Sequence, residues 1–354
     1  MKHGEAMRAA VYRGAGEVTI EDRPIPEPGP DEILIRVAAV GICGTDAHEY
    51  DSGPHMFPAT PFTPGHEFAG HVVERGSDVT GFAAGDLVAA GAGIPCGRCH
   101  WCRSGATNLC DRYQTLGLQL PGGLAQYVVA PGGTCLEVGS LGLSPDVAAL
   151  AQPMSIAVHS MKRGRPKPDD LAIVIGAGGI GAFLVHALTH HGVMTVVVDI
   201  DTERLAIART LGAEAAVQPE SLADVLEDLS GGVASVVYEV TGVPAGLELA
   251  LAATAPGTRV VVIGLQDGTH PVEFRRLALR ENELIGTNAH VFAADFAQAA
   301  ALLAARFGGW SDIAPVAIPL DDLVELGLRP LIEGTATRIK TLIDPWATQV
   351  RDII

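Results

Sequence analysis

The stretch LAIVIGAGGIGAFLVHALT, residues 171–189, decides the fold of the central part of the chain. It opens with a short apolar run typical of a buried strand and continues into an apolar helical segment that ends at Gly192. Between the two stand Gly176, Gly178 and Gly181, spaced as G-x-G-x-x-G. Glycines at this spacing let the backbone approach a pyrophosphate, and the start of the following helix attracts its charge. The stretch is apolar enough to suggest a membrane span, but its glycine-dense middle and the aspartates around it favour strand, turn and helix.

The residues that follow predict a dinucleotide site. The next strand, TVVVDI, contains Asp199 eighteen residues after Gly181, where a carboxylate can accept both ribose hydroxyls of an adenosine. A carboxylate there repels a 2′-phosphate, so we expect NAD rather than NADP. Arg204, one turn into the next helix, either flanks that ribose or is a solvated helix charge. A purely structural glycine turn is the alternative for the whole unit. The expected cofactor-binding set is Gly176, Gly178, Gly179, Ile180, Gly181, Asp199 and Arg204.

Strand and helix patterns alternate from about residue 170 onward. TVVVDI, SVVYEVTG and RVVVIGL predict further strands, with helical segments such as ERLAIARTLGA between them. This alternation of apolar strands and helices predicts a doubly wound parallel sheet covered on both faces. The first third is instead β-rich, with glycine turns and the proline-rich RPIPEPGPDE, which can be neither helix nor inner strand. After about residue 290 the pattern is mixed, with a helix expected near DFAQAAALLAARFG.

Length and composition restrict the class of protein. A chain of 354 residues is too long for one ordinary core and predicts two domains. Its 48% hydrophobic and 18% charged residues are typical of globular chains. A formal net charge of −17 repels phosphate backbones and anionic lipid, so we expect no nucleic-acid or membrane partner. The opening MKHGEA lacks the apolar core of a secretory signal. Met7 is the expected natural start, and we expect the first six residues to be a tag or extension outside the fold.

Four of the six cysteines fall within fifteen residues, which favours a metal site in a reducing, cytoplasmic compartment over a disulfide framework. They are spaced C-x2-C-x2-C-x7-C, at Cys96, Cys99, Cys102 and Cys110. Four thiolates close a tetrahedral zinc shell without an open position, so this zinc would be structural. Free surface thiols and an iron–sulfur cluster are the alternatives. Cys135 stands apart, and we expect a buried, inert thiol there.

Candidate catalytic residues come from two stretches of the first third, GICGTDAHEY (41–50) and TPGHEFAGHVV (63–73). Thiolate, imidazole and carboxylate groups are all competent zinc ligands, although each alone also fits an ordinary core or surface position. Combined with the glycine motif and the cysteine cluster, the set is specific. Its members are Cys43, Thr45, Asp46, His48, His66 and Glu67.

With these motifs, the chain resembles the zinc-containing medium-chain alcohol dehydrogenases, most of all the polyol group of sorbitol, butanediol and threonine dehydrogenases. The resemblance rests on the two stretches above, GDLV, the four-cysteine lobe, GAGGIG and VVVDID, and covers almost the whole chain from Met7. The run HEYDSGP is especially similar to butanediol dehydrogenases. The resemblance implies an α/β protein with a GroES-like β-rich catalytic domain, interrupted in sequence by a Rossmann NAD-binding domain. The expected bounds are 7–152 with 291–354 for the catalytic domain and 153–290 for the Rossmann domain, with the active site in the cleft between them.

The resemblance also implies a role for each candidate residue. The ligands of a catalytic zinc would be Cys43, His66 and Glu67. Asp46 would orient His66 and fix its tautomer. Thr45 would take the alcohol proton and pass it through the nicotinamide ribose to His48 and water. With the zinc of the cysteine lobe, each chain would hold two zinc ions. The catalytic zinc would lower the pKa of the substrate hydroxyl, and the cofactor would carry the hydride.

One position departs from the pattern of the polyol group. That group has a glutamate in ALxEPLxVxxH, whereas this chain has ALAQPMSIAVH, with Gln152 at the same place. Three interpretations stay open: Gln152 hydrogen-bonds zinc-bound water or a substrate hydroxyl, it coordinates zinc weakly through oxygen, or the site has lost tight zinc binding. The charges of Cys43 and Glu67 already neutralise a divalent zinc, so a neutral Gln152 keeps the site neutral and the metal a stronger Lewis acid.

These inferences predict a zinc-dependent oxidoreductase that transfers hydride between NAD and a secondary alcohol of a diol, polyol or sugar-like small molecule. The alternatives are a metal-free carbonyl or double-bond reductase of the same superfamily and a non-catalytic NAD-binding protein. Tyr50, Phe57 and Asn288 are pocket candidates because they lie near the motifs, and each also fits ordinary packing. We expect a homodimer or homotetramer formed through the Rossmann domain.

Overall fold

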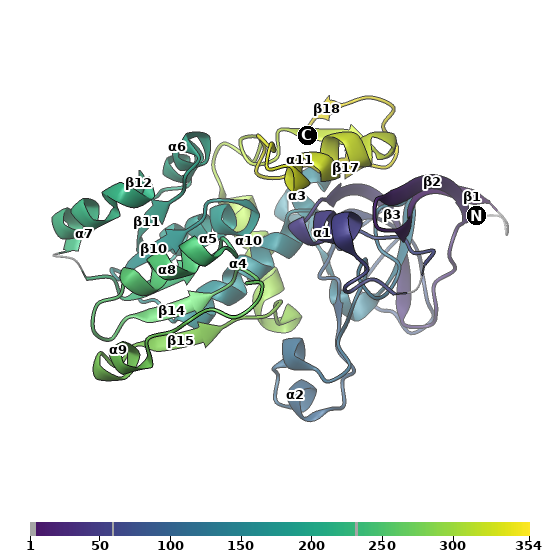
Figure 1. Ribbon diagram of the computed structural model, residues 1–354. Coiled ribbons are helices and arrows are strands. Elements are labelled where there is room, and N and C mark those ends of the chain that lie inside the picture. Colours follow the sequence, from purple (N-terminus) through teal and green to yellow (C-terminus); the bar gives the residue numbers. More distant parts are fainter. Residues whose placement is uncertain (1–4, 59, 231–232) are drawn as a thin grey trace. The chain divides into compact units, whose positions relative to one another are not determined.

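The computed structural model describes residues 5–58, 60–230 and 233–354, and the chain forms two compact units (Figure 1). One unit consists of Met1–Ser155 and His290–Ile354, and the other of Ile156–Ala289. Most of the expected N-terminal extension, residues 1–4, lies outside the described residues. Ala6, however, belongs to the first strand and pairs with Pro24, so the ordered fold begins before Met7. In the part of the chain that the structure describes, no helix has both the length and the apolar character needed to cross a membrane.

The central unit is a six-stranded sheet in which every neighbouring pair of strands is parallel, in the order β12-β11-β10-β13-β14-β15. The chain begins in the middle at β10, moves outward to β12, and then returns to the other side of β10 at β13. This reversal is the doubly wound arrangement predicted from the sequence, and it leaves the carboxyl ends of β10, β11 and β13 together at one edge. The strands are β10 (Leu171–Ile175), β11 (Met194–Val198), β12 (Ala215–Val217), β13 (Val236–Glu239), β14 (Arg259–Val262) and β15 (Glu283–Gly286).

The helices of the central unit follow the strands as the alternating pattern predicts. All five residues of β10 are buried, as expected for an apolar strand covered on both faces. The helix expected after the glycine motif is α5, and it starts at Gly179 directly after the glycine turn. The helices are α4 (Ala151–Gly164), which enters the unit, α5 (Gly179–His190), α6 (Thr202–Thr210), α7 (Leu222–Ser230), α8 (Pro244–Ala252) and α9 (Phe274–Leu279), with a 3-10 turn at Pro219–Ser221.

The other unit is built on an eight-stranded sheet and a two-stranded ribbon. The sheet runs β18-β16-β17-β3-β4-β5-β9, and β8 also pairs with β3. β17 comes from the tail of the chain and pairs antiparallel with β3, with Leu342 opposite Gly41. The ribbon is β1 (Ala6–Gly14) with β2 (Glu17–Pro24). The sheet strands are β3 (Glu32–Gly41), β4 (Glu67–Arg75), β5 (Leu87–Ala90), β8 (Tyr127–Pro131), β9 (Cys135–Glu137), β16 (Val316–Pro319), β17 (Leu342–Asp344) and β18 (Arg351–Asp352).

The helices of this unit are short. The helix expected near residues 295–308 is α10, which is preceded by a π-helical turn. The α-helices are α1 (Gly44–Ser52), α2 (His100–Arg103), α3 (Pro145–Ala148), α10 (Ala297–Ala305) and α11 (Arg329–Ile332). The 3-10 turns are Thr107–Leu109, Gly132–Thr134, Gly139–Leu141 and Leu320–Asp322, and the π-helical turns are Phe292–Phe296 and Leu323–Leu328.

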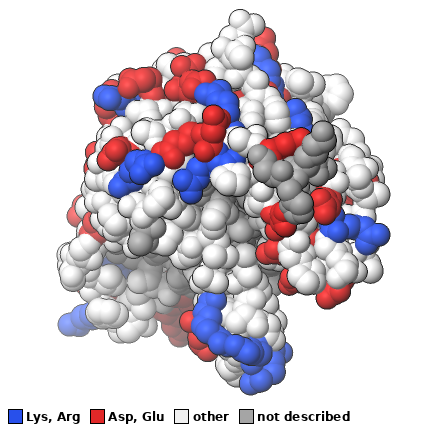
Figure 2. All heavy atoms as spheres, turned by 90° about the vertical axis from the view of Figure 1, so that its right-hand side faces the viewer, with Lys and Arg blue, Asp and Glu red and all other residues white. Residues whose placement is uncertain are grey.

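The segment around α2 forms a separate lobe, closed at its base by the small sheet of β6 (Gly93–Ile94) and β7 (Gln114–Thr115). Basic residues gather on the lobe at the foot of the view in Figure 2, on a protein whose net charge is −17. The exposed arginines of this segment are Arg98, Arg103 and Arg112.

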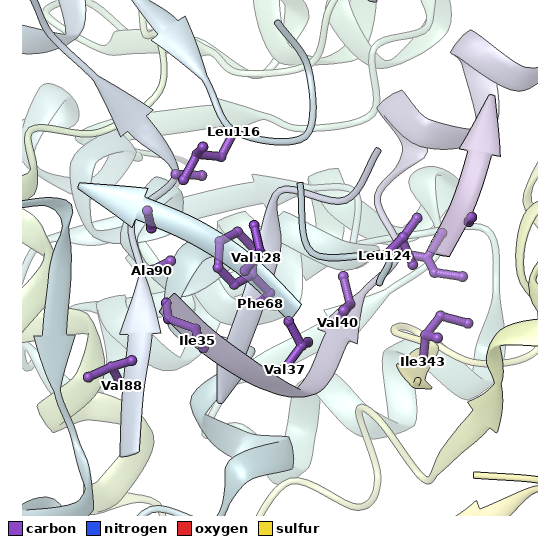
Figure 3. Close-up of a cluster of buried hydrophobic side chains, with 14 of the residues drawn as sticks. Ile35, Val37, Val40, Phe68, Val88, Ala90, Leu116, Leu124, Val128 and Ile343 are labelled. Atoms are coloured by element: carbon purple, nitrogen blue, oxygen red, sulfur yellow. The ribbon is translucent and has the colours of Figure 1, made fainter. Parts of the chain in front are cut away.

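The core of the sheet unit lies where β3, β4, β5 and β8 face one another. Figure 3 shows side chains from these strands and from the tail strand β17 packed in one cluster. The labelled members are Ile35, Val37, Val40, Phe68, Val88, Ala90, Leu116, Leu124, Val128 and Ile343. Because β3 and β4 are held by this core, the residues at the end of β3 and the start of β4 are placed rigidly.

Candidate active site and metal centres

The end of β3 and the start of β4 bring three candidate ligands together. Glu67 is the first residue of β4 and lies opposite Gly41, while Cys43 follows β3 by two residues. One ligand atom each from Cys43, His66 and Glu67 lie within 4.8 Å of one another. Gly41 makes room for the carboxylate, because a Cβ at that position would lie 2.3 Å from Oε2 of Glu67. The local geometry therefore assembles the thiol, imidazole and carboxylate that the sequence suggested.

Asp46, in the first turn of α1, stands beside two of these residues. Its Oδ2 accepts the backbone N–H of Cys43 at 3.0 Å. Its Oδ1 lies 3.6 Å from Nδ1 of His66, which is an ion-pair contact but too long for a hydrogen bond. Both of those atoms are buried and have no hydrogen-bond partner among the described residues. Since Nδ1 faces Asp46, the other ring nitrogen of His66 is left for a metal.

The surroundings shift the ionisation of the thiol and the imidazole in opposite directions. Burial alone raises the pKa of Cys43, but the hydrogen bond and charge of His66, together with the charge of Lys340, hold that pKa below its ordinary value. Burial lowers the pKa of His66, but Asp46 and Cys43 together raise it well above its ordinary value. The cluster thus favours a thiolate, which is the form that binds metals.

Lys340, just before β17, is a member of this site that the sequence reasoning missed. Its side chain is buried, and Nζ donates to both carboxylate oxygens of Glu67, at 2.6 and 2.5 Å, and to the Ile42 carbonyl at 3.2 Å. Burial lowers the pKa of Lys340, but Glu67, Cys43 and Asp46 raise it above its ordinary value. The sequence signal was limited to a lysine in RIKTLI, residues 338–343, shortly before the apolar Leu342 and Ile343.

The donor set fits a zinc ion. Thiolate, imidazole and carboxylate groups are the ligands that zinc takes in proteins, and three protein ligands with an open fourth position are typical of catalytic sites. The orphaned Nδ1 of His66 and its carboxylate neighbour match the arrangement that orients metal-bound histidines. Glu67 would be shared between such an ion and Lys340.

The two residues expected to relay a proton lie on α1. Oγ1 of Thr45 is 3.7 Å from Sγ of Cys43, so this hydroxyl is next to the candidate ligands. His48 lies one turn further and is exposed, and its ring stacks on the ring of His55 with 4.5 Å between centroids. The order from Thr45 to His48 leads from the partly buried thiol of Cys43 outward to solvent.

The remaining candidates of this region have different surroundings. Gln152 is 8% exposed and lies in the first turn of α4, just after α3, which packs on β3 and β4. Phe57 is buried between Tyr12 and Phe62, with ring centroids 4.9 and 5.1 Å away, so it is part of the packing rather than a pocket surface. Tyr50 is partly buried against the core shown in Figure 3, and Asn288 is exposed just after β15.

The four-cysteine cluster lies in the lobe around α2. Sulfur atoms of Cys96, Cys99, Cys102 and Cys110 lie within 4.8 Å of one another, and the sulfurs of Cys99 and Cys102 are 3.5 Å apart. Sγ of Cys110 accepts the backbone N–H of Cys96 at 3.2 Å. The backbone N–H of Arg98 is the main cause that lowers the pKa of Cys96 to about 6. Desolvation and the neighbouring thiols raise the pKa of Cys102 to about 12.

This arrangement fits a structural zinc. Four thiolates around a divalent zinc carry a net charge of −2, and the three exposed arginines of the same lobe offset it. Cys135, by contrast, is buried in β9, where burial raises its pKa to about 12, consistent with the inert thiol expected there.

The central unit contains a cavity of ≈ 750 Å³ at the carboxyl edge of its sheet. Four of the predicted cofactor residues line it: Gly176, Gly178, Asp199 and Arg204. The other predicted residues of the motif, from Gly179 to Gly181, form the first turn of α5. The N-cap residue of α5 is Gly178, which has no side chain to cap the helix, so the first N–H groups of α5 are available to an anion such as a pyrophosphate.

Two glycines of the motif are required for distinct reasons. Gly176 has a φ of +101°, and a Cβ there would lie 2.9 Å from the Thr241 side chain. A Cβ on Gly181 would lie 1.9 Å from the carbonyl oxygen of Gly176. At Gly178 the nearest neighbour of such a Cβ is Arg204, at 3.8 Å, so the space over Gly178 is left for a ligand.

Asp199 is fixed before any ligand binds. Its Oδ2 accepts the N–H of Ala177 at 2.7 Å, and its Oδ1 accepts the N–H of Asp201 at 2.9 Å. The carboxylate therefore sits at the start of the glycine turn, on the wall of the cavity. Arg204 reaches the same wall, with Nε 3.6 Å from Oδ2 of Asp201.

The chain belongs to the zinc-dependent medium-chain alcohol dehydrogenase family. Residues 29–140 match the alcohol dehydrogenase GroES-like domain, and residues 179–305 match the zinc-binding dehydrogenase domain. The chain is 34% identical over 266 residues to the sorbitol dehydrogenase of Bacillus subtilis (strain 168), a match that covers 73% of this chain and 75% of that one. The protein is accordingly an oxidoreductase with a GroES-like unit and a Rossmann unit, as predicted.

Solved structures agree with this assignment. A zinc-binding dehydrogenase from Sinorhizobium meliloti 1021, whose structure contains NADP, has a TM-score of 0.86 at 30% identity, covering 96% of this chain and 100% of that one. The 2R,3R-butanediol dehydrogenase from Bacillus subtilis has a TM-score of 0.86 at 28% identity, covering 96% and 99%. Zinc and a nicotinamide dinucleotide are the cofactors of this family.

Proposed function

We propose that the protein oxidises a secondary alcohol of a diol, polyol or sugar-like molecule, with NAD as hydride acceptor and a zinc ion held by Cys43, His66 and Glu67. The observation that carries the proposal is the cluster of these three ligands beside Asp46 and Thr45, in which His66 and Glu67 are buried and Cys43 is partly buried. A metal-free reductase or a non-catalytic protein would have no use for this cluster. The names of the sorbitol and butanediol relatives support the substrate class.

The residues of the cluster divide the chemistry among them. A zinc ion bound here would act as a Lewis acid toward the alcohol oxygen. Asp46 holds the Cys43 backbone and faces His66, so it fixes the orientation of the imidazole. Thr45, whose hydroxyl lies next to Cys43, would accept the alcohol proton, and the exposed His48 would deliver it to water. Gln152 lies at the start of α4, directly after α3, which packs on β3 and β4, and our proposal for it is a neutral hydrogen-bonding group beside the substrate.

The preference for NAD over NADP rests on Asp199. Its carboxylate is fixed by two backbone N–H groups on the cavity wall and is suited to accept ribose hydroxyls. A 2′-phosphate would bring negative charge against it.

Metal analysis combined with two cysteine variants tests this function. We expect two zinc ions per wild-type chain. Cys43→Ser should keep one zinc and lose alcohol-dependent NAD reduction, whereas Cys102→Ser should lose the lobe zinc and make the segment 96–112 sensitive to protease. Full activity of Cys43→Ser with a panel of diols, polyols and cyclitols would refute the zinc mechanism.

We further propose a homo-oligomer formed through the central unit. β15 is an edge strand of its sheet, and apolar side chains near it are exposed: Phe274 (73%), Leu279 (76%) and Leu284 (43%). Such an edge is covered in many proteins by a second copy. None of the six cysteines, all within the described residues, forms a disulfide, which supports a reducing, cytoplasmic location.

A further inference from the structure

A buried carboxylate outside the metal cluster organises the loop that follows β13. Glu239 is the last residue of β13 and is fully buried. Its Oε1 accepts the N–H groups of Thr241 at 2.7 Å and Gly242 at 3.0 Å, and also the Thr241 hydroxyl. One oxygen of Glu239 thus fixes the turn that contains Thr241, and Thr241 lines the 750 Å³ cavity.

The same residue ties this loop to the next one. The main-chain oxygen of Glu239 accepts the N–H of Gly264 at 3.1 Å, and Oε2 accepts the side-chain amide of Gln266 at 2.9 Å. A Cβ on Gly264 would lie 2.1 Å from the nitrogen of Gly242, so the two loops are in direct contact. Glu239 therefore connects the loops beyond β13 and β14.

The carboxylate also determines which way the Gln266 amide faces. Nε2 donates to Oε2 of Glu239, because the reversed amide would bring two acceptor oxygens together. Oε1 of Gln266 consequently faces away from Glu239. It is buried and has no hydrogen-bond donor among the described residues. A buried acceptor without a donor is costly, so its persistence in a fixed orientation points to a donor on a ligand.

The sheet order indicates which part of the cofactor would supply that donor. Asp199, expected to hold the adenosine ribose, follows β11, and the glycine turn for the pyrophosphate follows β10. Continuing in the same direction along the sheet leads to the loops after β13 and β14. Beyond the adjacent β15, Oγ1 of Thr287 is a second buried polar atom without a partner among the described residues. The half of the dinucleotide that carries nicotinamide would lie over these loops.

We propose that Gln266, oriented by Glu239, accepts a hydrogen bond from the nicotinamide riboside half of the cofactor. Glu239 is then a positioning residue and Gln266 a contact residue. The inference rests on the proposed function, since it requires that the protein binds a nicotinamide dinucleotide. Two groups of the nicotinamide riboside can donate a hydrogen bond to Oε1 of Gln266: the carboxamide NH2 and the ribose hydroxyls.

Ligand binding by the Gln266→Met variant tests the proposal, because methionine has a similar length and neither donates nor accepts strongly. The dissociation constant of NADH, measured by calorimetry, should rise about tenfold, and that of AMP should stay the same. The reduced 3-acetylpyridine analogue of the cofactor, which lacks the NH2 group, and ADP-ribose, which lacks nicotinamide, separate the two donors. A loss confined to NADH assigns the carboxamide, and a loss that extends to ADP-ribose assigns the ribose.

Glu239→Gln provides the second variant, because it frees the Gln266 amide to turn over. Glu239→Gln should lose affinity for the same ligands as Gln266→Met among NADH, the acetylpyridine analogue and ADP-ribose. A loop that was merely loosened would not reproduce that pattern. Unchanged NADH affinity in Gln266→Met, or an equal loss for AMP, would overturn the inference. Absence of NADH binding by the wild-type protein would instead overturn the proposed function.

Discussion

Nζ of Lys340 lies 2.6 and 2.5 Å from the two carboxylate oxygens of Glu67, and both side chains are more than nine-tenths buried. This pair changes the charge count that the sequence suggested. Cys43 and Glu67 alone would neutralise a divalent zinc, and the structure adds a positive charge on Lys340 and a negative one on Asp46. The summed charge of these four side chains and a zinc ion is again zero. The difference is that a cation, Lys340, is in direct contact with the candidate ligand Glu67.

Removing that cation should make the fold depend on zinc. In Lys340→Met, the buried Glu67 carboxylate has no cationic partner unless a metal is present, so the metal-free form should lose about 3–5 kcal/mol of stability. We expect the melting temperature of this variant to fall much further in a chelator than that of the wild type. Lys167→Met, at an exposed lysine, is the matched control and should behave as wild type. Equal chelator sensitivity of Lys340→Met and wild type would contradict the role of the pair.

Asp199 and Asp201 provide a test of cofactor choice with an internal control. Asp199→Ala removes the carboxylate on the cavity wall, so kcat/KM for NAD should fall and the ratio of NAD to NADP should drop about tenfold or more. Asp201 instead caps α6, accepting the N–H groups of Glu203 and Arg204. Asp201→Ala should cost about 1 kcal/mol of stability and leave the ratio unchanged. An equal drop of the NAD to NADP ratio in Asp199→Ala and Asp201→Ala would show that Asp199 acts only through the local fold.

The tail of the chain is anchored by Arg351. Its guanidinium donates to both oxygens of Asp146, at 2.7 and 2.8 Å, and to Asp344 at 2.8 Å, and Asp146 is fully buried. Arg351→Met would leave Asp146 with the backbone N–H of Ile354, at 2.8 Å, as its remaining donor among the described residues, so we expect a loss of about 3–5 kcal/mol.

An exposed pair calibrates that measurement. Arg329 and Glu325 are 3.0 Å apart, with side chains 50% and 66% exposed. Arg329→Met should cost about 0–1 kcal/mol. Thermal unfolding of both variants checks the difference, and similar melting temperatures would mean that the Arg351 cluster contributes no more than a surface pair.

Cys135 predicts a change of stability with pH. Burial raises its pKa in the folded protein to about 12, whereas an unfolded cysteine has a pKa of about 8.5. Below about pH 8.5 the thiol is neutral in both states; above it the unfolded state loses the proton first, and folding weakens until the pH reaches the folded value. At pH 9.5 the loss is about 1.4 kcal/mol. The melting temperature of wild type should therefore decline more between pH 7 and pH 9.5 than that of Cys135→Ala; equal declines would argue against a buried neutral thiol.

Features encoded in short stretches were predicted well from the sequence. The strand, glycine turn and helix at 171–189 appear as β10 and α5, because apolar periodicity and glycine spacing act locally. The four cysteines and the Cys43, His66 and Glu67 group also come together as their motifs suggested. The roles assigned to these residues remain predictions that the variants above test.

Features that depend on distant pairing were missed. Lys340 reaches Glu67 only because β17 pairs with β3, and no local pattern announces that pairing. Glu239 stood unnoticed within SVVYEVTG, since the run predicts a strand whether or not its carboxylate has buried partners. For Phe57 the sequence left a pocket position and ordinary packing open, and the contacts with the rings of Tyr12 and Phe62 favour packing.

The position of β17 in the sheet has a consequence for biosynthesis. The central unit has all its strands by Gly286, so its sheet can close while the remaining residues are still being made. The sheet that carries Cys43, His66 and Glu67 must wait for Leu342–Asp344 to pair with β3. Until then Glu67 has no lysine beside it. A nascent chain can therefore complete its nucleotide-binding unit before Lys340 balances the charge of Glu67 in the metal-binding unit.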